Sequence, residues 1–358
     1  MRVIDTTTTS GLARLIELGQ SAWYDNLTRS LARGGLRELI DAYGITGVTS
    51  NPTIFEKAIL AGNDYADQLL ELASTSPAEK YWALVIDDIR CAADCLAAVY
   101  ESTDGHDGYV SVEVSPLLAR DTEGTVDQAR ELFERIARPN VMIKIPATLE
   151  GLPAITEVVA AGINVNVTLI FSLERYAAVI EAYIAGISRL ADPSSVASVA
   201  SFFVSRVDTE TDRRLPVDHE ARGKVAVANA KLAYELFELK FSTERFAELA
   251  AGGARVQRPL WASTSTKNPE YSPTLYVTEI VGVNSVNTLA PASIDALGVA
   301  LTMAPNSVRT DIDGARRTIA SLVSAGVDFA DVTQTLELEG VESFANSYLA
   351  CLDAIAGI

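Results

Sequence analysis

Apolar, strand-like segments alternate with helix-like segments along most of this chain. Strand character occurs at residues 21–26, 47–51, 109–115, 141–145, 164–170, 197–204, 258–263 and 285–289. Between these segments apolar residues recur at three- and four-residue spacing, as over 125–136 and 173–187, which indicates helices. Strand and helix repeated eight times predict a closed α/β TIM barrel, (β/α)8, of parallel strands, and an open doubly wound sheet is the alternative.

One predicted helix has a recognisable start, and other predicted helices are additional to the eight strand–helix units. Ser76 before Pro77 predicts a cap and a first helical turn, so a helix should cover 77–99. Residues 208–250 are charged and helical in pattern, which predicts extra helices after the sixth strand. The tail at 309–358 predicts further helices packed on the outside. Because no linker or low-complexity tract divides the chain, we expect a single TIM-barrel domain over residues 1–358.

Several predicted strands carry polar residues at every second position, although the strands of a parallel barrel are covered on both faces. The polar positions are Asp25, Asn51, Ser111, Glu113, Lys144, Asn166 and Thr168. A single buried polar group could be structural, but each one costs free energy unless it is paired. A set on five strands therefore predicts a pocket for a hydrophilic ligand at the C-terminal strand ends.

One lysine, Lys144, lies in the middle of an apolar strand-like run. It is the only one of the seven lysines in such a setting. Loss of hydration favours the neutral amine, which is a nucleophile, so Lys144 indicates Schiff-base chemistry on a carbonyl substrate. The alternative, which this segment alone favours equally, is a structural lysine paired with a carboxylate.

Composition narrows the functions and partners that the chain can have. The formal net charge of -18 argues against nucleic acid or an anionic membrane as partner, but a local cluster of cations could still bind a phosphorylated substrate. Three cysteines without metal-ligand spacing and two histidines in acidic surroundings predict no metal site and no serine–histidine chemistry. No apolar run is long enough to span a membrane, and residues 1–20 do not resemble a signal peptide, so we expect a cytoplasmic protein.

Two later segments predict anion binding. Arg206 follows the apolar run of the sixth strand, and residues 263–268 supply hydroxyls, backbone amides and Lys267 where a helix could start. The alternative interpretation of residues 263–268 is a run of Ser and Thr that caps a helix.

Taken together, these motifs resemble the transaldolase family, in its longer bacterial subgroup. The matching pieces, in the family's order, are Trp23-Tyr24-Asp25-Asn26, Gly47-Val48-Thr49-Ser50-Asn51-Pro52, Val112-Glu113-Val114, Ile143-Lys144-Ile145-Pro146-Ala147-Thr148, the run at 164–172 and Ser201-Phe202-Phe203-Val204-Ser205-Arg206. The resemblance continues over 283–288. It implies a (β/α)8 barrel that transfers a dihydroxyacetone unit from sedoheptulose 7-phosphate to glyceraldehyde 3-phosphate, in the non-oxidative pentose phosphate pathway. It implies no metal or organic cofactor.

The resemblance also implies a role for each site residue. Lys144 would form the Schiff base, Asp25 would be the general base for carbon–carbon cleavage, and Glu113 would act through a water positioned by Thr168. The substrate-binding residues implied are Asn51 and Asn166 for the sugar hydroxyls, and Ser201 and Arg206 for the phosphate.

The chain departs from the family pattern at the second phosphate position. Lys267 stands where shorter members have an arginine, and a lysine offers a point charge in place of a planar fork. Phe203 stands where fructose-6-phosphate aldolases of the same superfamily carry a tyrosine, which favours transfer over simple cleavage. A class I aldolase and a non-catalytic sugar-phosphate-binding barrel are the rival hypotheses. A homo-oligomer is compatible with the sequence, which does not fix the oligomeric state.

Overall fold

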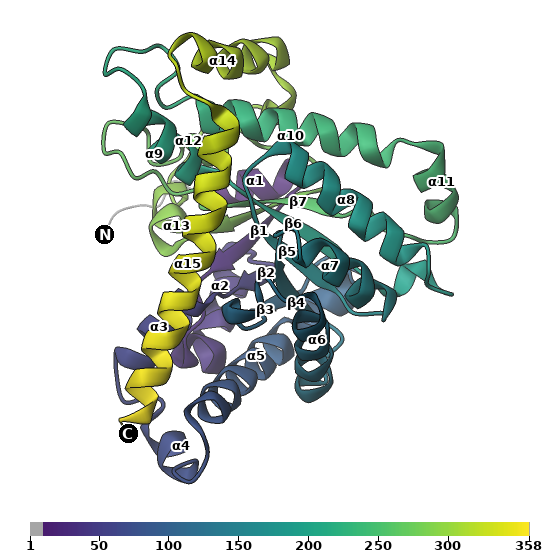
Figure 1. Ribbon diagram of the computed structural model, residues 1–358, viewed down its shortest axis with the longest axis vertical. Helices are drawn as coiled ribbons and strands as arrows, with labels where there is room; N and C mark the ends of the chain where they lie inside the picture. The colour runs from purple at the N-terminus through teal and green to yellow at the C-terminus, as the bar shows by residue number, and fades with distance from the viewer. Residues whose placement is uncertain (1–9, 358) are drawn as a thin grey trace, which may run out of the picture.

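Eight parallel strands close into a barrel in chain order in the computed structural model, which describes residues 10–357 (Figure 1). The strands are β1 Gln20–Asp25, β2 Gly47–Thr49, β3 Tyr109–Glu113, β4 Val141–Pro146, β5 Val165–Ile170, β6 Ser198–Phe203, β7 Arg258–Ala262 and β8 Ser285–Leu289. Each agrees with its predicted range to within two residues. Because β1 also pairs with β8, the barrel is confirmed and the open sheet is excluded.

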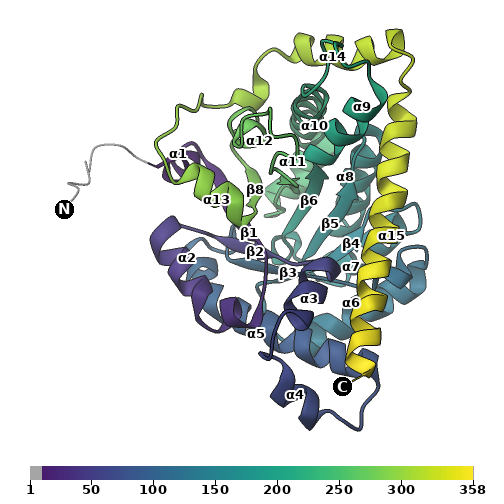
Figure 2. The same ribbon diagram turned by 90° about the vertical axis from the view of Figure 1, so that its left-hand side faces the viewer.

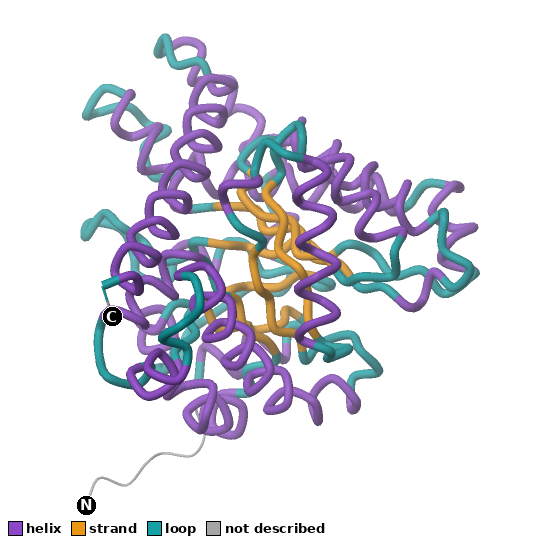
Figure 3. The backbone as a smooth tube through the Cα atoms, turned by 60° about the horizontal axis from the view of Figure 1, so that its bottom comes forward, coloured by secondary structure: helices purple, strands orange, loops and turns teal. Residues whose placement is uncertain are grey.

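Helices surround the strands on all sides, as the tube in Figure 3 shows. They are α1 Gly11–Glu17, α2 Leu36–Tyr43, α3 Pro52–Leu60, α4 Ala66–Glu71, α5 Pro77–Ser102, α6 Thr122–Ile136, α7 Gly151–Ala160, α8 Leu173–Ile187, α9 Ser205–Arg214, α10 Val225–Phe241, α11 Glu244–Ala251, α12 Leu275–Thr278, α13 Pro291–Leu297, α14 Ile312–Ser324 and α15 Phe329–Ala356. The three helices predicted between the strands are confirmed as α5, α6 and α8.

The predicted start of α5 is a complete capping box. The Ser76 hydroxyl accepts from the Glu79 amide, the Glu79 carboxylate accepts from the Ser76 amide, and Pro77 occupies the first turn. This arrangement satisfies donors that the first turn of a helix otherwise leaves free. The capping pattern in the sequence therefore located the first residue of this helix correctly.

The extra helices after the sixth strand are confirmed as α9, α10 and α11. Helix α10 packs against α8 and α14. Within residues 10–357, no helix combines the length and the apolar composition that a membrane crossing requires.

The further helices predicted for the C-terminal tail are confirmed as α14 and α15. Helix α15 packs on the helices α3, α5 and α9 and also contacts β5, and Figure 2 shows it alongside the strands. Its buried residues recur at three- and four-residue spacing: Val332, Leu336, Gly340, Phe344, Tyr348, Cys351 and Ile355. Gly340 allows close approach, because a Cβ there would lie 2.9 Å from a methyl group of Leu169 in β5.

Candidate active site

Lys144 projects from β4 into the C-terminal end of the barrel, and its side chain is almost fully enclosed. The residue is 5% exposed. Its ammonium nitrogen lies 3.4 Å from Glu113 Oε2 and donates to the Ser50 carbonyl at 3.1 Å. The ring of Phe344, from α15, has its centre 6.0 Å from the same nitrogen. The Lys144 nitrogen is therefore buried and lies close to one carboxylate, that of Glu113, and one backbone carbonyl, that of Ser50.

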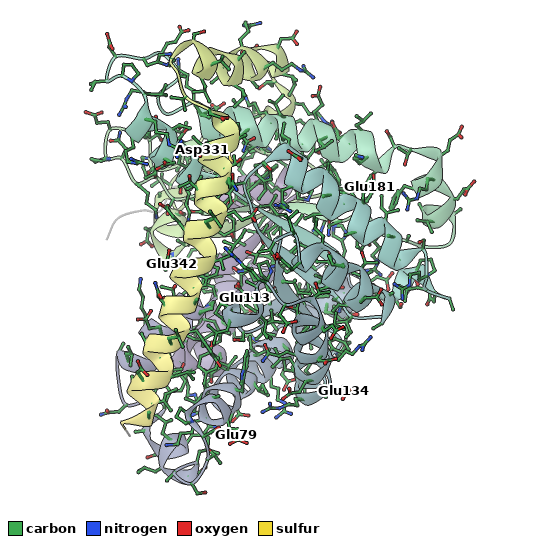
Figure 4. The ribbon with its side chains drawn as sticks, in the orientation of Figure 1. Glu79, Glu113, Glu134, Glu181, Asp331 and Glu342 are labelled. Atoms are coloured by element: carbon green, nitrogen blue, oxygen red, sulfur yellow. The ribbon has the colours of Figure 1, made fainter. Side chains whose placement is uncertain are left out.

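Glu113 lies next to Lys144 because β3 and β4 pair with these two residues in register. Figure 4 shows Glu113 within the body of the molecule, whereas Glu79, Glu134 and Glu181 lie at its periphery. Burial raises the pKa of the Glu113 carboxyl, and the positive charges of Lys144 and Arg206 offset part of that rise. A carboxyl with a raised pKa is suited to donate as well as accept a proton near neutral pH.

Asp25 and Asn51 come from the first two strands of the barrel. Asp25 ends β1, and its carboxylate accepts a hydrogen bond of 2.9 Å from the Thr49 hydroxyl in β2. Asn51 caps α3, and its Oδ1 accepts from the Ile54 amide at 3.0 Å. Because the cap occupies the oxygen, the Asn51 Nδ2 is the atom available to donate to a ligand.

A chain of hydrogen bonds crosses the barrel interior from β6 to β3. The Ser201 hydroxyl donates to Asn166 Oδ1 at 2.7 Å, and Asn166 Nδ2 donates to the Ser111 hydroxyl at 3.0 Å. The Ser50 hydroxyl donates to the Ser111 carbonyl at 2.8 Å. Asn166 is register-paired with Lys144, so this network fixes the amide beside the lysine. Two of its members, Asn166 and Ser201, are predicted site residues.

Thr168 lies on β5, where the strand is irregular. Leu169 has φ of 60°, and the β5–β6 register shifts between Val167 and Ile170. Leucine disfavours this left-handed conformation, and such strain is concentrated at functional sites. The Thr168 hydroxyl and Glu113 Oε2 are both buried without a well-formed hydrogen bond within residues 10–357. The site thus contains two oxygens that could hold a polar reactant.

A cavity of about 340 Å³ opens onto Lys144. It is lined by seven predicted site residues: Asp25, Asn51, Lys144, Ser201, Phe203, Arg206 and Lys267. The cations Lys57, Lys144, Arg206 and Lys267 face it, and Asp25 is the one carboxylate among the described residues that lines it. Other cavities of about 480 and 650 Å³ are larger, but neither contains Lys144.

The predicted anion ligands differ in their surroundings. Arg206, in the first turn of α9, has its guanidinium 5.2 Å from the centre of the Phe203 ring. Burial lowers the pKa of Arg206, although arginine stays charged in proteins. Lys267 is exposed and donates to the Ser265 hydroxyl at 2.9 Å. Phe203 also packs against Phe171, with ring centres 5.1 Å apart, so its position is fixed from both sides.

Sequence reasoning missed four contributors to the site: Thr49, Ser50, Lys57 and Phe344. Ser50 acts through its backbone carbonyl, which has no signature in the sequence. Phe344 belongs to the buried stripe of α15, and that stripe was readable in the sequence as apolar and small residues at four-residue spacing. Within the described residues, no group of His, Cys, Asp and Glu side chains is arranged to hold a metal ion.

These features define a class of protein: a (β/α)8 barrel with a buried amine and carboxylate at the C-terminal strand ends. A family model described as transaldolase/fructose-6-phosphate aldolase matches residues 22–355. A protein named transaldolase from Thermobifida fusca is 52% identical, over 97% of this chain and 98% of that protein. Transaldolases of Mycolicibacterium smegmatis and Saccharopolyspora erythraea are 49% and 48% identical, again over at least 96% of each chain. The chain belongs to the transaldolase/fructose-6-phosphate aldolase family of enzymes.

Proposed function

We propose that this enzyme is a transaldolase, which moves a dihydroxyacetone unit from sedoheptulose 7-phosphate to glyceraldehyde 3-phosphate. The products are erythrose 4-phosphate and fructose 6-phosphate. The observation that carries the proposal is the Lys144 nitrogen, 5% exposed as a residue and 3.4 Å from Glu113, in a cavity lined by Asp25. The name and full-length similarity of the relatives support it.

The first step joins the Lys144 nitrogen to the ketose carbonyl carbon. The amine adds to this carbon, and the resulting carbinolamine loses its hydroxyl as water to give a protonated imine. Glu113 lies near enough to exchange these protons, directly or through a water held against the Thr168 hydroxyl. Both oxygens are buried without a well-formed hydrogen bond within residues 10–357, which suits them to this task.

The second step breaks the bond between C3 and C4 of the ketose. Asp25 removes the C4 hydroxyl proton, the C4–O bond becomes a carbonyl, and the electron pair of the broken bond moves into the iminium. The aldose leaves, and a three-carbon enamine stays on Lys144. The reverse sequence then adds this unit to the acceptor aldehyde. The hydrogen bond from Thr49 keeps the Asp25 carboxylate oriented toward the cavity.

The remaining residues bind the substrate along its length. We assign the hydroxyls near the imine to Asn51 and Asn166, and the phosphate to Arg206 and Lys267. The family resemblance implies a phosphate contact for Ser201 as well. However, Ser201 is 2% exposed and donates to Asn166, so we propose that it contacts the carbon chain near Lys144 instead.

Phe203 favours transfer over release of free dihydroxyacetone. Its ring lines the cavity and has no hydroxyl with which to protonate the enamine. A class I aldolase would form product from fructose 6-phosphate without an acceptor, and a non-catalytic binder would form none with one. An assay with and without glyceraldehyde 3-phosphate or erythrose 4-phosphate separates the three functions.

Borohydride trapping tests the proposed function directly. Reduction in the presence of fructose 6-phosphate is expected to add a three-carbon mass to wild-type protein, on Lys144. Lys80 is an internal control, because it is also 5% exposed and lies outside the cavity. Lys144→Ala should abolish both the adduct and turnover. An active wild-type enzyme without an adduct on Lys144 would refute the mechanism.

We also propose a cytoplasmic location and a single domain. Three free cysteines fit a reducing compartment. One continuous hydrophobic cluster extends from Leu12 to Ile355, which is what a single folding unit requires. Self-association stays a prediction that light scattering can check.

A further inference from the structure

Three of the cations that line the active-site cavity form no ion pair within residues 10–357. Of the described cations that line the cavity, only Lys144 has a carboxylate within ion-pair distance, at 3.4 Å. None of the other ion pairs within residues 10–357 involves Lys57, Arg206 or Lys267. In a chain with 47 acidic and 29 basic residues, three such cations around one cavity indicate an anionic ligand.

Lys57 is the member of this group that no sequence motif identified. It lies in the last turn of α3, and Asn51, Ile54 and Lys57 line the cavity at three-residue spacing. Six residues of helix span about 9 Å, so α3 carries Lys57 well beyond the Asn51 cap. Glu56, its neighbour, lines a different cavity together with Glu339 and Glu342 of α15. Helix α3 therefore directs its cation and its carboxylate into separate cavities.

We propose that Lys57 is a third phosphate-binding residue of this site, and that it sets the preference for phosphorylated over unphosphorylated substrates. This inference rests on the proposed function. A phosphate presents three oxygens, and the exposed Lys57 has three donors and no hydrogen-bond partner within residues 10–357. Arg206 and Lys267 supply cations from β6–α9 and the segment after β7, so Lys57 adds a contact from a third part of the barrel.

The test compares Lys57→Gln, Lys57→Arg and the control Lys224→Gln with the wild-type enzyme. Lys224 is also exposed but lies outside the cavity, so its loss removes one surface charge only. The readout is the ratio of kcat/KM for glyceraldehyde 3-phosphate to kcat/KM for glyceraldehyde, with fructose 6-phosphate as donor. Competitive inhibition by inorganic phosphate is measured in the same proteins.

Lys57→Gln is expected to lower the substrate ratio roughly three- to tenfold and to weaken phosphate inhibition by a similar factor, because a partly exposed cation contributes less than a buried one. The loss should lie in KM and shrink as salt is added. Lys57→Arg should retain most of the ratio, and Lys224→Gln should not change it.

An unchanged ratio in Lys57→Gln, or an equal drop in Lys224→Gln, overturns the inference. A merely structural role for Lys57 would lower activity on both aldehydes equally, which also overturns it. Borohydride trapping on wild-type Lys144 is run alongside. If the adduct forms and the ratio is unchanged, only the role of Lys57 fails; if no adduct forms on active enzyme, the proposed mechanism fails.

Discussion

Replacing Asp208 by asparagine should flatten the pH dependence of stability. Asp208 lies in the first turn of α9, two residues after Arg206, and is 1% exposed. Its carboxylate accepts from the Ala226 amide and the Tyr276 hydroxyl, both at 2.7 Å. Burial nevertheless raises the pKa of Asp208 from 3.8 to about 7, because the two hydrogen bonds do not offset the loss of hydration and the negative charge of the nearby Asp212 adds to the rise.

The direction of the effect follows from where the proton is bound. In the folded protein Asp208 keeps its proton up to about pH 7, whereas in the unfolded chain it loses the proton near 3.8. The folded state is therefore favoured at low pH, and this contribution is lost as the pH rises from about 4 to about 7. Between pH 5 and pH 8 the loss amounts to roughly 2.5 kcal/mol, on the order of 3 °C in Tm for a chain of this length.

Thermal unfolding of wild type and Asp208→Asn at pH 5 and pH 8 measures this difference. Asparagine keeps the shape and an acceptor oxygen, and the substitution leaves every other titratable group in place. The variant should therefore lose about 3 °C less than wild type between the two pH values. Equal losses in the two proteins would refute the reasoning, because Asp208 would then titrate at its ordinary value in the fold. Tyr276→Phe provides a control that removes one hydrogen bond and keeps the carboxyl.

Three further substitutions test the catalytic residues and the packing of α15 against the barrel. Asp25→Asn should still form the imine but not cleave the ketose, so borohydride with fructose 6-phosphate should fix a six-carbon adduct; a three-carbon adduct would exclude Asp25 as the base. Glu113→Gln should slow imine formation by about 10²- to 10⁴-fold, measured as the rate of borohydride inactivation, and an unchanged rate would exclude its role in proton transfer. Gly340→Val should lower Tm and activity together, because even a Cβ at this position would lie 2.9 Å from Leu169. Overpacking of this kind costs about 1–3 kcal/mol of stability. A variant that kept both the Tm and the activity of wild type would contradict the close packing of α15 on β5.

The barrel and most of the site were predictable because the relevant patterns are local. A strand alternates its faces every two residues, so the polar faces of β3 and β5 already placed Glu113 and Thr168 on the same side as their polar neighbours. Strand register then brought Glu113 beside Lys144. Only this pairing between strands had to come from the structure.

The unpredicted parts of the site depend on contacts between distant segments. Phe344 reaches Lys144 because α15 packs on α3 and β5, and the sequence does not specify that path. The left-handed backbone at Leu169 is imposed by its surroundings, since leucine does not favour it. Lys57 is an ordinary exposed lysine in sequence, and only the placement of α3 turns it toward the cavity.

The position of α15 makes the order of synthesis matter. Every proposed catalytic side chain is made before residue 169, but α15, which carries Phe344, begins only at Phe329. A nascent chain or a proteolytic product that lacks α15 would possess the amine and both acids but would expose them to water on the side that Phe344 lines. Enzymatic activity would therefore require that α15 has been synthesised and has packed in place.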